Sequence, residues 1–409
     1  GACRSIYSTM RFTVCVIGLG YVGLPTAVLL ASAGNNVIGV DSNKVLLDEL
    51  VAGYVRNQEP GLTDYLRTSL ASGKLTLADK PKSADYYIIC VPTPIDSCSK
   101  PDLSYLWSAI DALVDVISSR QTVIIESTIP VGTTLSAEKR ILDHPLCEDK
   151  ELLNFAHCPE RVLPGNAINE IKTNSRVIGG LTSASAESAA KLYRTFCNSH
   201  FTLCHANIAE FSKLAENAYR DVNIAFANEL SMMCEAEGIS ATDVISIANL
   251  HPRVDILSPG IGVGGHCIPV DPLFLVTRYP HLTALIQSAR SVNKLKEGHS
   301  YEKIVSMYKS SKCDEIVIYG LTYKQDVDDT RESPALRIAS ALNTQYPGSV
   351  SVIDPMLDEG YILYLGLTPS SIGRIKRSSL VVILVEHSLQ LGTLLEYCSN
   401  LGINVLKLT

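Results

Sequence analysis

The chain has 409 residues, which corresponds to two or three domains of ordinary size. Hydrophobic residues make up 46% and charged residues 19%, so the composition excludes a disordered or fibrous protein. The 35 lysines and arginines are outnumbered by 42 aspartates and glutamates, which gives a net charge of -7. No basic cluster stands out that could follow a phosphate backbone, and we therefore expect no nucleic-acid partner.

Twelve cysteines are scattered without a C-x-x-C pair or a spacing typical of zinc sites or disulfide frameworks. We therefore expect a reducing, cytoplasmic location and no metal. Residues 12–40 carry no charge and resemble a membrane anchor, but glycines and Pro25 divide them into strand, turn, helix and strand, so we expect no membrane association. Residues 1–9 have no pattern, and we expect the native start at Met10.

A βαβ unit opens the chain. β-Branched residues at 12–17 predict a strand, residues 22–33 suit a helix, and residues 36–40 predict a second strand that ends at Asp41. Further apolar runs extend this unit into a parallel sheet covered by helices. These runs lie at residues 86–91 and 122–125.

A long helix is predicted over residues 206–237, which contain no glycine or proline. Its apolar side chains cannot all face one neighbour. They are Phe211, Leu214, Ala218, Val222, Ile224, Ala225, Phe226, Leu230 and Met233. Such a helix is usually buried between domains or subunits, and we expect a homodimer or larger assembly.

The last third of the chain has a second α/β pattern. A helical stretch runs to about Lys296, and Ser333-Pro334 is typical of a helix N-terminus. Strand patterns lie at residues 315–319, 349–353 and 380–385. We predict an α/β protein with two Rossmann-like, doubly wound parallel-sheet domains, joined by a long central helix and a helical dimerisation region. The predicted domains are residues 1–204, 205–297 and 298–409.

Residues 18–23 match the pattern G-x-G-x-x-G between a predicted strand and a predicted helix. The glycines let the backbone approach a pyrophosphate at the positive end of the helix. The residues expected at the dinucleotide are Gly18, Gly20, Tyr21, Val22 and Gly23. Asp41 would accept hydrogen bonds from ribose hydroxyls and repel a 2′-phosphate, which favours NAD over NADP.

The corresponding turn of the second α/β unit, residues 320–324, has one glycine and ends at Lys324. It is not a second dinucleotide fingerprint. Lys324 could hold the phosphates of another nucleotide as a point charge, and a solvated surface lysine is the alternative.

Cys267 lies in a glycine-rich loop, residues 262–271, in which Pro269 stiffens the exit. This setting suits a nucleophile, and an inert buried thiol is the alternative. Lys213, Asn217 and Arg220 share one face of the long helix because they are four and three residues apart.

Polar groups on an apolar helix need partners, and ion pairs of these residues with Glu210 or Glu216 are one explanation. A lysine and an asparagine aimed at one point could instead stabilise an oxyanion. With a cysteine and NAD, this predicts a four-electron oxidation. An alcohol becomes an aldehyde, a thiolate adds, a second hydride removal gives a thioester, and water releases the acid.

Eight motifs resemble the nucleotide-sugar 6-dehydrogenase family, also called the UDP-glucose/GDP-mannose dehydrogenase family, along nearly the whole chain. They lie at residues 16–25, 91–94, 126–134, 158–165, 176–180, 213–230, 262–272 and 331–334. Residues 251–254 and 220–225 look most like the UDP-N-acetyl-D-mannosamine dehydrogenase branch. The resemblance implies that residues 1–204 bind NAD, residues 205–297 dimerise and carry catalytic residues, and residues 298–409 bind the nucleotide sugar.

The resemblance also implies residue roles. Cys267 would form the thiohemiacetal and thioester, and Lys213 and Asn217 would hold the oxyanion. Asp271 and Glu160 would manage water and protons, and Thr128 would position a water. The implied NAD contacts include Pro92, Thr93, Thr128 and Arg331. The implied substrate contacts are Glu160, Arg161, Leu163, Lys213, Asn217, Arg220, Arg253, Gly264 and Lys324, with Arg253 reaching the partner subunit's substrate.

Family members commonly end with a strand and a basic residue that contacts the sugar nucleotide, a role that Lys407 could take.

The prediction is NAD-dependent oxidation of the C6 alcohol of UDP-N-acetyl-D-mannosamine to the uronic acid. UDP-N-acetylglucosamine and UDP-glucose are alternative substrates. A two-electron dehydrogenase would not need Cys267, and a non-enzymatic NAD-binding protein would not need Lys213, Asn217 or Cys267.

Overall fold

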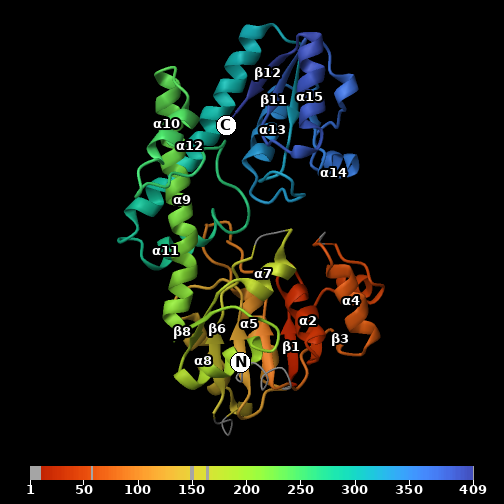
Figure 1. Cartoon of the computed structure of the whole chain (residues 1–409), viewed down its shortest axis with the longest axis vertical. Helices are drawn as coiled ribbons and strands as arrows, with labels where there is room; N and C mark the ends of the chain where they lie inside the picture. The colour runs from red at the N-terminus through yellow and green to blue at the C-terminus, as the bar shows by residue number, and fades with distance from the viewer. Residues whose placement is uncertain (1–10, 57–58, 148–151, 163–164, 409) are drawn as a thin grey trace. The chain divides into compact units, whose positions relative to one another are not determined.

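The computed structural model describes residues 11–56, 59–147, 152–162 and 165–408. It divides into two compact units, Gly1–Ala215 and Glu216–Thr409, each with its own sheet and core (Figure 1). The expected start at Met10 and the predicted substrate contact Leu163 lie outside the described residues.

The first unit is built on an eight-stranded sheet with the strand order β3-β2-β1-β4-β5-β6-β7-β8. The strands are β1 (Thr13–Ile17), β2 (Asn36–Val40), β3 (Leu75–Ala78), β4 (Tyr86–Ile89), β5 (Thr122–Ile125), β6 (Asn154–His157), β7 (Arg176–Gly180) and β8 (Phe201–His205). The first six are parallel and adopt the order typical of a dinucleotide-binding fold. The expected α/β architecture is thereby confirmed.

Strand β7 departs from the predicted parallel sheet because it pairs with β6 in antiparallel orientation. In the described part of the segment between them, the short helix α7 (Ala167–Thr173) is the one regular element. The chain therefore re-enters the sheet from the edge at which β6 ended, without crossing back as a parallel connection requires. Strand β8 is parallel to β7, so both run opposite to the first six strands.

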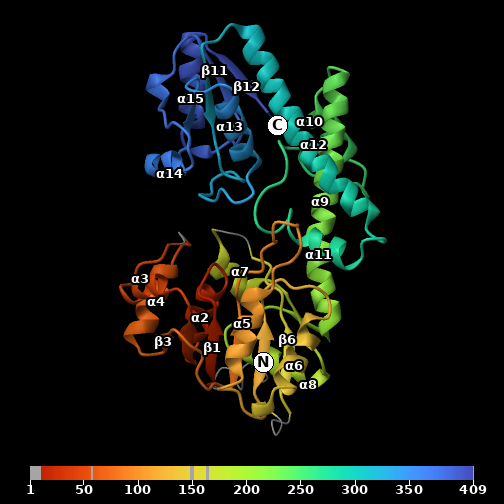
Figure 2. The same cartoon turned by 180° about the vertical axis from the view of Figure 1, so that it is seen from behind.

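Helices cover both faces of this sheet, as Figure 2 shows for α2 and for α5 and α6. The helices are α2 (Gly23–Ser32), α3 (Lys44–Val51), α4 (Leu62–Ala71), α5 (Ser104–Leu113), α6 (Thr133–Leu142) and α8 (Ser183–Tyr193), with a 3-10 turn at Pro145–Cys147. Alternate residues of β1 point to opposite faces. Val14 packs in the same core as Val28 of α2, whereas Cys15 packs with Ile110 of α5.

The second unit contains a parallel four-stranded sheet with the order β10-β9-β11-β12. Its strands are β9 (Glu315–Tyr319), β10 (Val350–Ile353), β11 (Ser379–Ile383) and β12 (Asn404–Lys407). Its helices are α13 (Pro334–Gln345), α14 (Glu359–Tyr364) and α15 (Ser388–Leu401), with a 3-10 turn at Ile372–Arg374. The predicted start of α13 is confirmed, because the Ser333 side chain accepts a hydrogen bond from the Leu336 amide and Pro334 is the first helical residue.

Four further helices are α9 (Ala206–Ala236), α10 (Ala241–Ala248), α11 (Asp271–Arg278) and α12 (Ala284–Ser311). The prediction for α9 is confirmed to within one residue. The predicted end of α12 near Lys296 is wrong, because burial of Ser300, Ile304 and Val305 carries the helix through Gly298 to Ser311. No helix of the described residues has the length and apolarity that a membrane span requires.

Candidate functional site

The glycine loop follows β1 and opens α2 in the first unit. Gly18 has φ +89°, and a Cβ there would lie 2.8 Å from the Cys90 carbonyl oxygen. A Cβ on Gly23 would lie 1.8 Å from the Gly18 carbonyl oxygen, so both positions need glycine. A Cβ on Gly20 would meet no atom within 4 Å, which leaves the backbone open to a ligand. The loop therefore fits a pyrophosphate at the N-terminus of α2.

Asp41 ends β2 beside the glycine loop. Its carboxylate accepts hydrogen bonds from the Leu19 amide at 2.9 Å and from the Asn43 amide at 2.9 Å. It therefore helps to shape the loop, a role that the sequence pattern did not predict. Tyr21 is held by a hydrogen bond of 2.6 Å from its hydroxyl to Glu59.

The loops after β4 and β5 lie next to the glycine loop, since these strands follow β1 in the sheet. Thr93 donates a hydrogen bond of 2.7 Å to the Thr128 carbonyl, and Ser127 donates one of 2.6 Å to the Val91 carbonyl. Pro92 is exposed between them. The carboxyl ends of β1, β4 and β5 thus bring together the predicted cofactor residues of this unit at the usual ligand-binding edge.

Glu160 follows β6, the next strand at the same edge. Burial raises the pKa of its carboxyl group, and the nearby charge of Lys213 partly offsets this effect. Its side chain accepts a hydrogen bond from the Val162 amide. A small cavity of about 20 Å³ is lined by Glu160 and Arg161 together with Val22 of the glycine loop.

A buried ion pair in the lining of this cavity was not predicted from the sequence. Glu126 accepts a hydrogen bond of 2.5 Å from the Tyr193 hydroxyl and lies 4.0 Å from the Arg176 guanidinium. Both charged side chains are almost fully buried. A carboxylate directly after the apolar strand β5 was the one local signal for this pair.

Helix α9 carries Lys213 in the first unit and Asn217 in the second, four residues further along. Both side chains are buried, at 7% and 6% exposure. Glu210 does not form the ion pair considered above. Its carboxylate accepts hydrogen bonds from the Gly132 amide at 2.6 Å and from the Thr134 amide and hydroxyl at 2.8 and 2.6 Å, and it thereby caps α6.

The second unit brings Asn217 next to the cysteine loop. The Asn217 amide donates a hydrogen bond of 2.6 Å to the carboxylate of Asp271, and both residues are buried. The Asp271 backbone amide in turn donates to the Cys267 carbonyl at 2.8 Å. An amide, a carboxylate and a half-buried thiol are therefore assembled at the N-terminus of α11.

Tyr323 lies beneath the cysteine loop, with its ring 2.8 Å from a Cβ built on Gly265. Burial raises the pKa of its hydroxyl, with Asp329 and Cys267 acting in the same direction and Arg331 and Arg220 opposing them. The proximity of Tyr323 and Asp329 to Cys267 was not predicted from the sequence, because no spacing rule links these residues.

Arg331 forms a bidentate pair with Asp329, with distances of 2.7 to 3.1 Å. This hydrogen bonding raises the pKa of Arg331. Burial acts to raise the pKa of Asp329, but the hydrogen bonds from Arg331 outweigh it and the net shift is downward. The pair fixes the guanidinium of a predicted NAD contact.

The remaining predicted substrate contacts are spread over the second unit. Lys324 and Arg253 are exposed, and no hydrogen bond of either side chain joins it to another described residue. Gly264 packs closely, since a Cβ there would lie 2.7 Å from the Glu332 carbonyl oxygen. Lys407 makes an ion pair of 2.9 Å with Glu386.

Three family models of the UDP-glucose/GDP-mannose dehydrogenase family match the chain in succession. They are the NAD binding domain over residues 12–197, the central domain over 207–295 and the UDP binding domain over 317–393. The cofactor is therefore NAD, as predicted, and the UDP binding domain indicates a UDP-sugar substrate.

Individual relatives cover most of the chain. An NDP-N-acetyl-D-galactosaminuronic acid dehydrogenase from Ralstonia nicotianae is 42% identical over 92% of this chain and 90% of its own length. A UDP-N-acetyl-D-mannosamine dehydrogenase from Campylobacter jejuni is 43% identical over 85% of this chain and 87% of its own.

Solved structures agree with these relatives. A UDP-N-acetylmannosamine dehydrogenase from Staphylococcus aureus has a TM-score of 0.84 and 39% identity, and covers 92% of this chain and 89% of its own. The UDP-D-ManNAc dehydrogenase of Pyrococcus horikoshii also has a TM-score of 0.84, with 36% identity over 95% of this chain and 93% of its own. The chain therefore belongs to the UDP-glucose/GDP-mannose dehydrogenase family of NAD-dependent oxidoreductases.

Proposed function

We propose that this enzyme oxidises the C6 alcohol of UDP-N-acetyl-D-mannosamine to the uronic acid in two successive two-electron steps. The observation that carries the proposal is the buried Asn217–Asp271 pair of 2.6 Å, attached to the Cys267 loop. Two relatives and two solved structures that share this sugar in their names support the choice of substrate. Bound NAD would supply the hydride acceptor for both oxidations.

Cys267 acts as the nucleophile in this proposal. Its thiolate adds to the C6 aldehyde to form a thiohemiacetal, and the second hydride removal converts this adduct into a thioester. Lys213 and Asn217 donate hydrogen bonds to the developing oxyanion. The burial of both side chains suits this role, because donors in a water-poor environment stabilise charge more strongly.

Hydrolysis of the thioester requires a water and a group that accepts its proton. We assign these tasks to Glu160 and Asp271, with Thr128 positioning a water. The raised pKa of Glu160 suits a carboxyl group that must take up a proton in the reaction. Asp271 is held in place by Asn217, so the same asparagine serves the oxyanion and the carboxylate.

Substrate binding is assigned to residues of both units and to a partner subunit. Lys324 neutralises the UDP phosphates, Arg220 supports the N-acetyl sugar, and Arg253 reaches the substrate of the partner in a homodimer. Glu160, Arg161, Leu163, Gly264 and Lys407 complete the proposed substrate contacts. Pro92, Thr93 and Arg331 complete the proposed NAD contacts.

The organisation proposed for the chain is an NAD-binding domain at residues 1–204, a central dimerisation and catalytic region at 205–297 and a nucleotide-sugar domain at 298–409. A cytoplasmic location is part of the proposal, since a reducing compartment keeps the Cys267 thiol available.

A second candidate substrate is UDP-N-acetyl-D-galactosamine. It is favoured by the Ralstonia relative, whose name specifies N-acetyl-D-galactosaminuronic acid and which is 42% identical. Both candidates carry a 2-acetamido group, and they differ in the configuration of this group at C2 and of the hydroxyl at C4.

The test is the NADH yield per mole of sugar, measured with UDP-N-acetyl-D-mannosamine, UDP-N-acetyl-D-glucosamine, UDP-N-acetyl-D-galactosamine and UDP-glucose. The proposal predicts two NADH per substrate and the highest kcat/KM with the manno epimer. A yield of one NADH per substrate would indicate a two-electron dehydrogenase instead. A higher kcat/KM with another sugar would show that this other sugar is the substrate, without contradicting the proposed mechanism.

A further inference from the structure

A cavity of about 300 Å³ lies in the second unit, at the C-terminal end of α9. Helices α9 and α12 form its walls, together with Ile239, Ile261 and Leu408. Figures 1 and 2 show α12 crossing this end of α9. None of the lining residues belongs to the proposed catalytic, NAD or UDP-sugar contacts.

Basic side chains of α12 dominate the lining. Lys296, His299 and Lys303 are three and four residues apart and therefore share one face of the helix. Glu235 of α9 is the one carboxylate among the lining residues that the structure describes. It binds His299 at 3.0 Å through one oxygen and Lys303 at 2.8 Å through the other.

Lys296 is the most deeply placed of these cations, with 6% of the residue exposed. Its ammonium donates a hydrogen bond of 2.8 Å to the Ser231 hydroxyl, and no ion pair joins it to another described residue. Burial lowers the pKa of this ammonium, while the more distant Glu235 opposes the shift. A buried cation with a neutral partner is costly unless an anion completes its environment.

The charges of the described lining residues do not balance. Lys296 and Lys303 supply two positive charges against one negative charge on Glu235, so the excess is one with neutral His299 and two with protonated His299. A phosphomonoester carries about -1.5 to -2 charges at neutral pH and would neutralise the excess of two that protonated His299 produces, whereas a single carboxylate would leave one of these charges. The Ser300 hydroxyl adds a donor suited to phosphate oxygens, whereas the Ser231 hydroxyl already donates to the Asn228 carbonyl at 2.7 Å.

We propose that this cavity is a second ligand site that binds a small phosphomonoester, with its phosphate at Lys296 and Lys303 and its body against Ile239 and Ile261. The volume is at the lower end of the range for small-molecule pockets, and it accommodates a phosphorylated monosaccharide rather than a nucleotide. The ligand would join α9 to α12 and stabilise the second unit.

The test is isothermal titration calorimetry on the full chain, saturated with NAD and UDP so that the nucleotide sites are filled. Inorganic phosphate and glucose 6-phosphate are the probes. The proposal predicts one site per chain for at least one probe under these conditions. Absence of binding by both probes, or binding that is lost when UDP is present, would overturn it.

Two variants locate the binding. Lys296→Met removes the buried ammonium, and Lys303→Gln removes the more exposed one, whose side chain is 38% exposed. Each should weaken binding by about tenfold or more, since each removes a charge-assisted hydrogen bond. Lys309→Gln, on an exposed α12 lysine outside the cavity, is the matched control and should bind as the parent does.

If Lys296→Met fails to fold, Lys303→Gln decides the question alone, because its partner Glu235 keeps His299. Unchanged affinity in the folded variants would contradict the proposal. Oxidation of UDP-sugars is measured separately, so a failure of this site leaves the proposed function untouched.

Discussion

Cys267 forms the covalent bond in the proposed mechanism, and Cys267→Ser is its sharpest test. A serine hydroxyl can still add to the aldehyde, but an alkoxide leaves far less readily than a thiolate during hydrolysis. The first hydride removal does not need sulfur. The variant should therefore release at most about two NADH per active site in a rapid burst and then stall, as followed by absorbance at single-turnover enzyme concentrations.

Lys213→Ala provides the companion measurement, because it removes the cationic oxyanion donor and leaves the thiol. Steady turnover should fall by roughly a hundredfold or more. Near-normal steady turnover of Cys267→Ser would contradict the thioester mechanism and favour a two-electron dehydrogenase.

We expect Asp41 to control the choice between NAD and NADP. Its carboxylate is fixed by the Leu19 and Asn43 amides, so it stays at the end of β2, where an NADP phosphate would meet a like charge. We expect kcat/KM to favour NAD over NADP by about tenfold or more, and Asp41→Asn to narrow this ratio. Equal efficiencies of the parent enzyme with the two cofactors would show that Asp41 does not face the ribose.

Arg220 is the residue that we assign to the N-acetyl sugar. It is exposed on α9, close enough to Tyr323 for its charge to act on that hydroxyl. Arg220→Ala should raise KM for UDP-N-acetyl sugars by about tenfold and affect UDP-glucose less, because one hydrogen bond to a charged donor is lost. An equal change for all substrates, or none, would refute this role.

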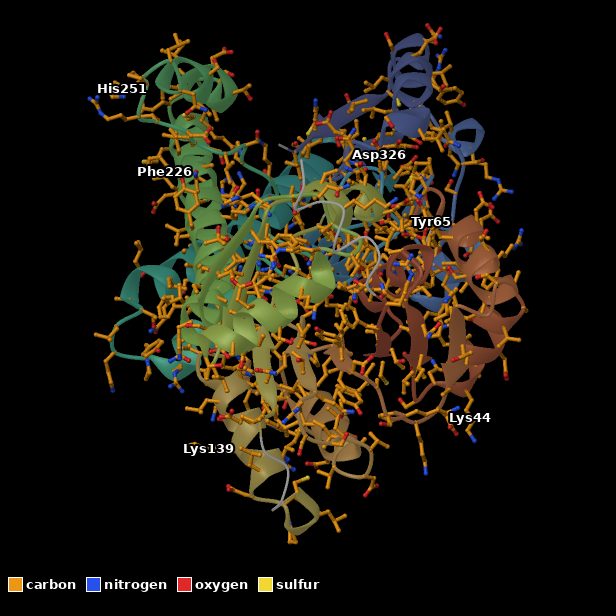
Figure 3. All side chains as sticks on the ribbon, turned by 60° about the horizontal axis from the view of Figure 1, so that its bottom comes forward. Lys44, Tyr65, Lys139, Phe226, His251 and Asp326 are labelled. Carbon is orange, nitrogen blue, oxygen red and sulfur yellow. The ribbon has the colours of Figure 1, made fainter. Side chains whose placement is uncertain are left out.

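Helix α9 has two distinct faces over its C-terminal half. One face packs on α12 through buried polar contacts, such as Asp221 with Arg290 at 2.6 Å and Asn228 with Asn293 at 2.9 Å. The other face exposes Tyr219, Phe226 and Met233, seven residues apart, at 64%, 51% and 52%. Figure 3 shows Phe226 pointing away from the helix. An exposed apolar stripe of this kind is typical of a subunit interface.

We therefore expect Phe226→Glu to dissociate a homodimer, because the substitution would bury an unpaired charge in the interface. Sedimentation velocity at micromolar concentration should show dimers or larger species for the parent and monomers for the variant. Val51→Glu, at a residue of α3 with 67% exposure, is the control and should not change the assembly. A parent protein that is folded and monomeric would contradict the expected homodimer.

At the scale of the whole molecule, a fully buried histidine makes stability depend on pH. His157 of β6 hydrogen-bonds the Ile125 carbonyl at 2.8 Å through Nδ1. Burial lowers its pKa from 6.5 to about 3, against the opposing Ile125 hydrogen bond and with help from Lys213. Below pH 6.5, His157 is protonated in the unfolded chain but stays neutral in the folded chain. The contribution of His157 to the free energy of unfolding is therefore lost progressively as pH falls toward 3.

The expected loss is about 2 kcal/mol between pH 6.5 and 5, at 1.36 kcal/mol per pH unit for one proton. His157→Gln has no group that titrates in this range and should lose correspondingly less. Urea unfolding followed by the fluorescence of the single tryptophan, Trp107, reports on the first unit. Parallel pH dependence of the two proteins would show that His157 is not the cause.

Much of the fold follows from local signals. Strands β2, β5 and β9 match the predicted residues, and α9 and the capped start of α13 are as predicted. Their apolar patterns and caps involve residues close in sequence. Strand β7 was not predicted, since Arg176 opens it and its direction depends on pairing with β6 rather than on its own residues.

The sequence by itself determined the glycine loop with Asp41 and the spacing of Lys213 and Asn217, because helix and turn geometry relate residues that are near neighbours in the chain. Only the tertiary structure decided that Asn217 binds Asp271, 54 residues away, and that Glu210 caps α6. It also decided that Tyr323 lies under Cys267. Burial forces a polar group to find a partner, but the partner is whichever group the packed chain brings within reach.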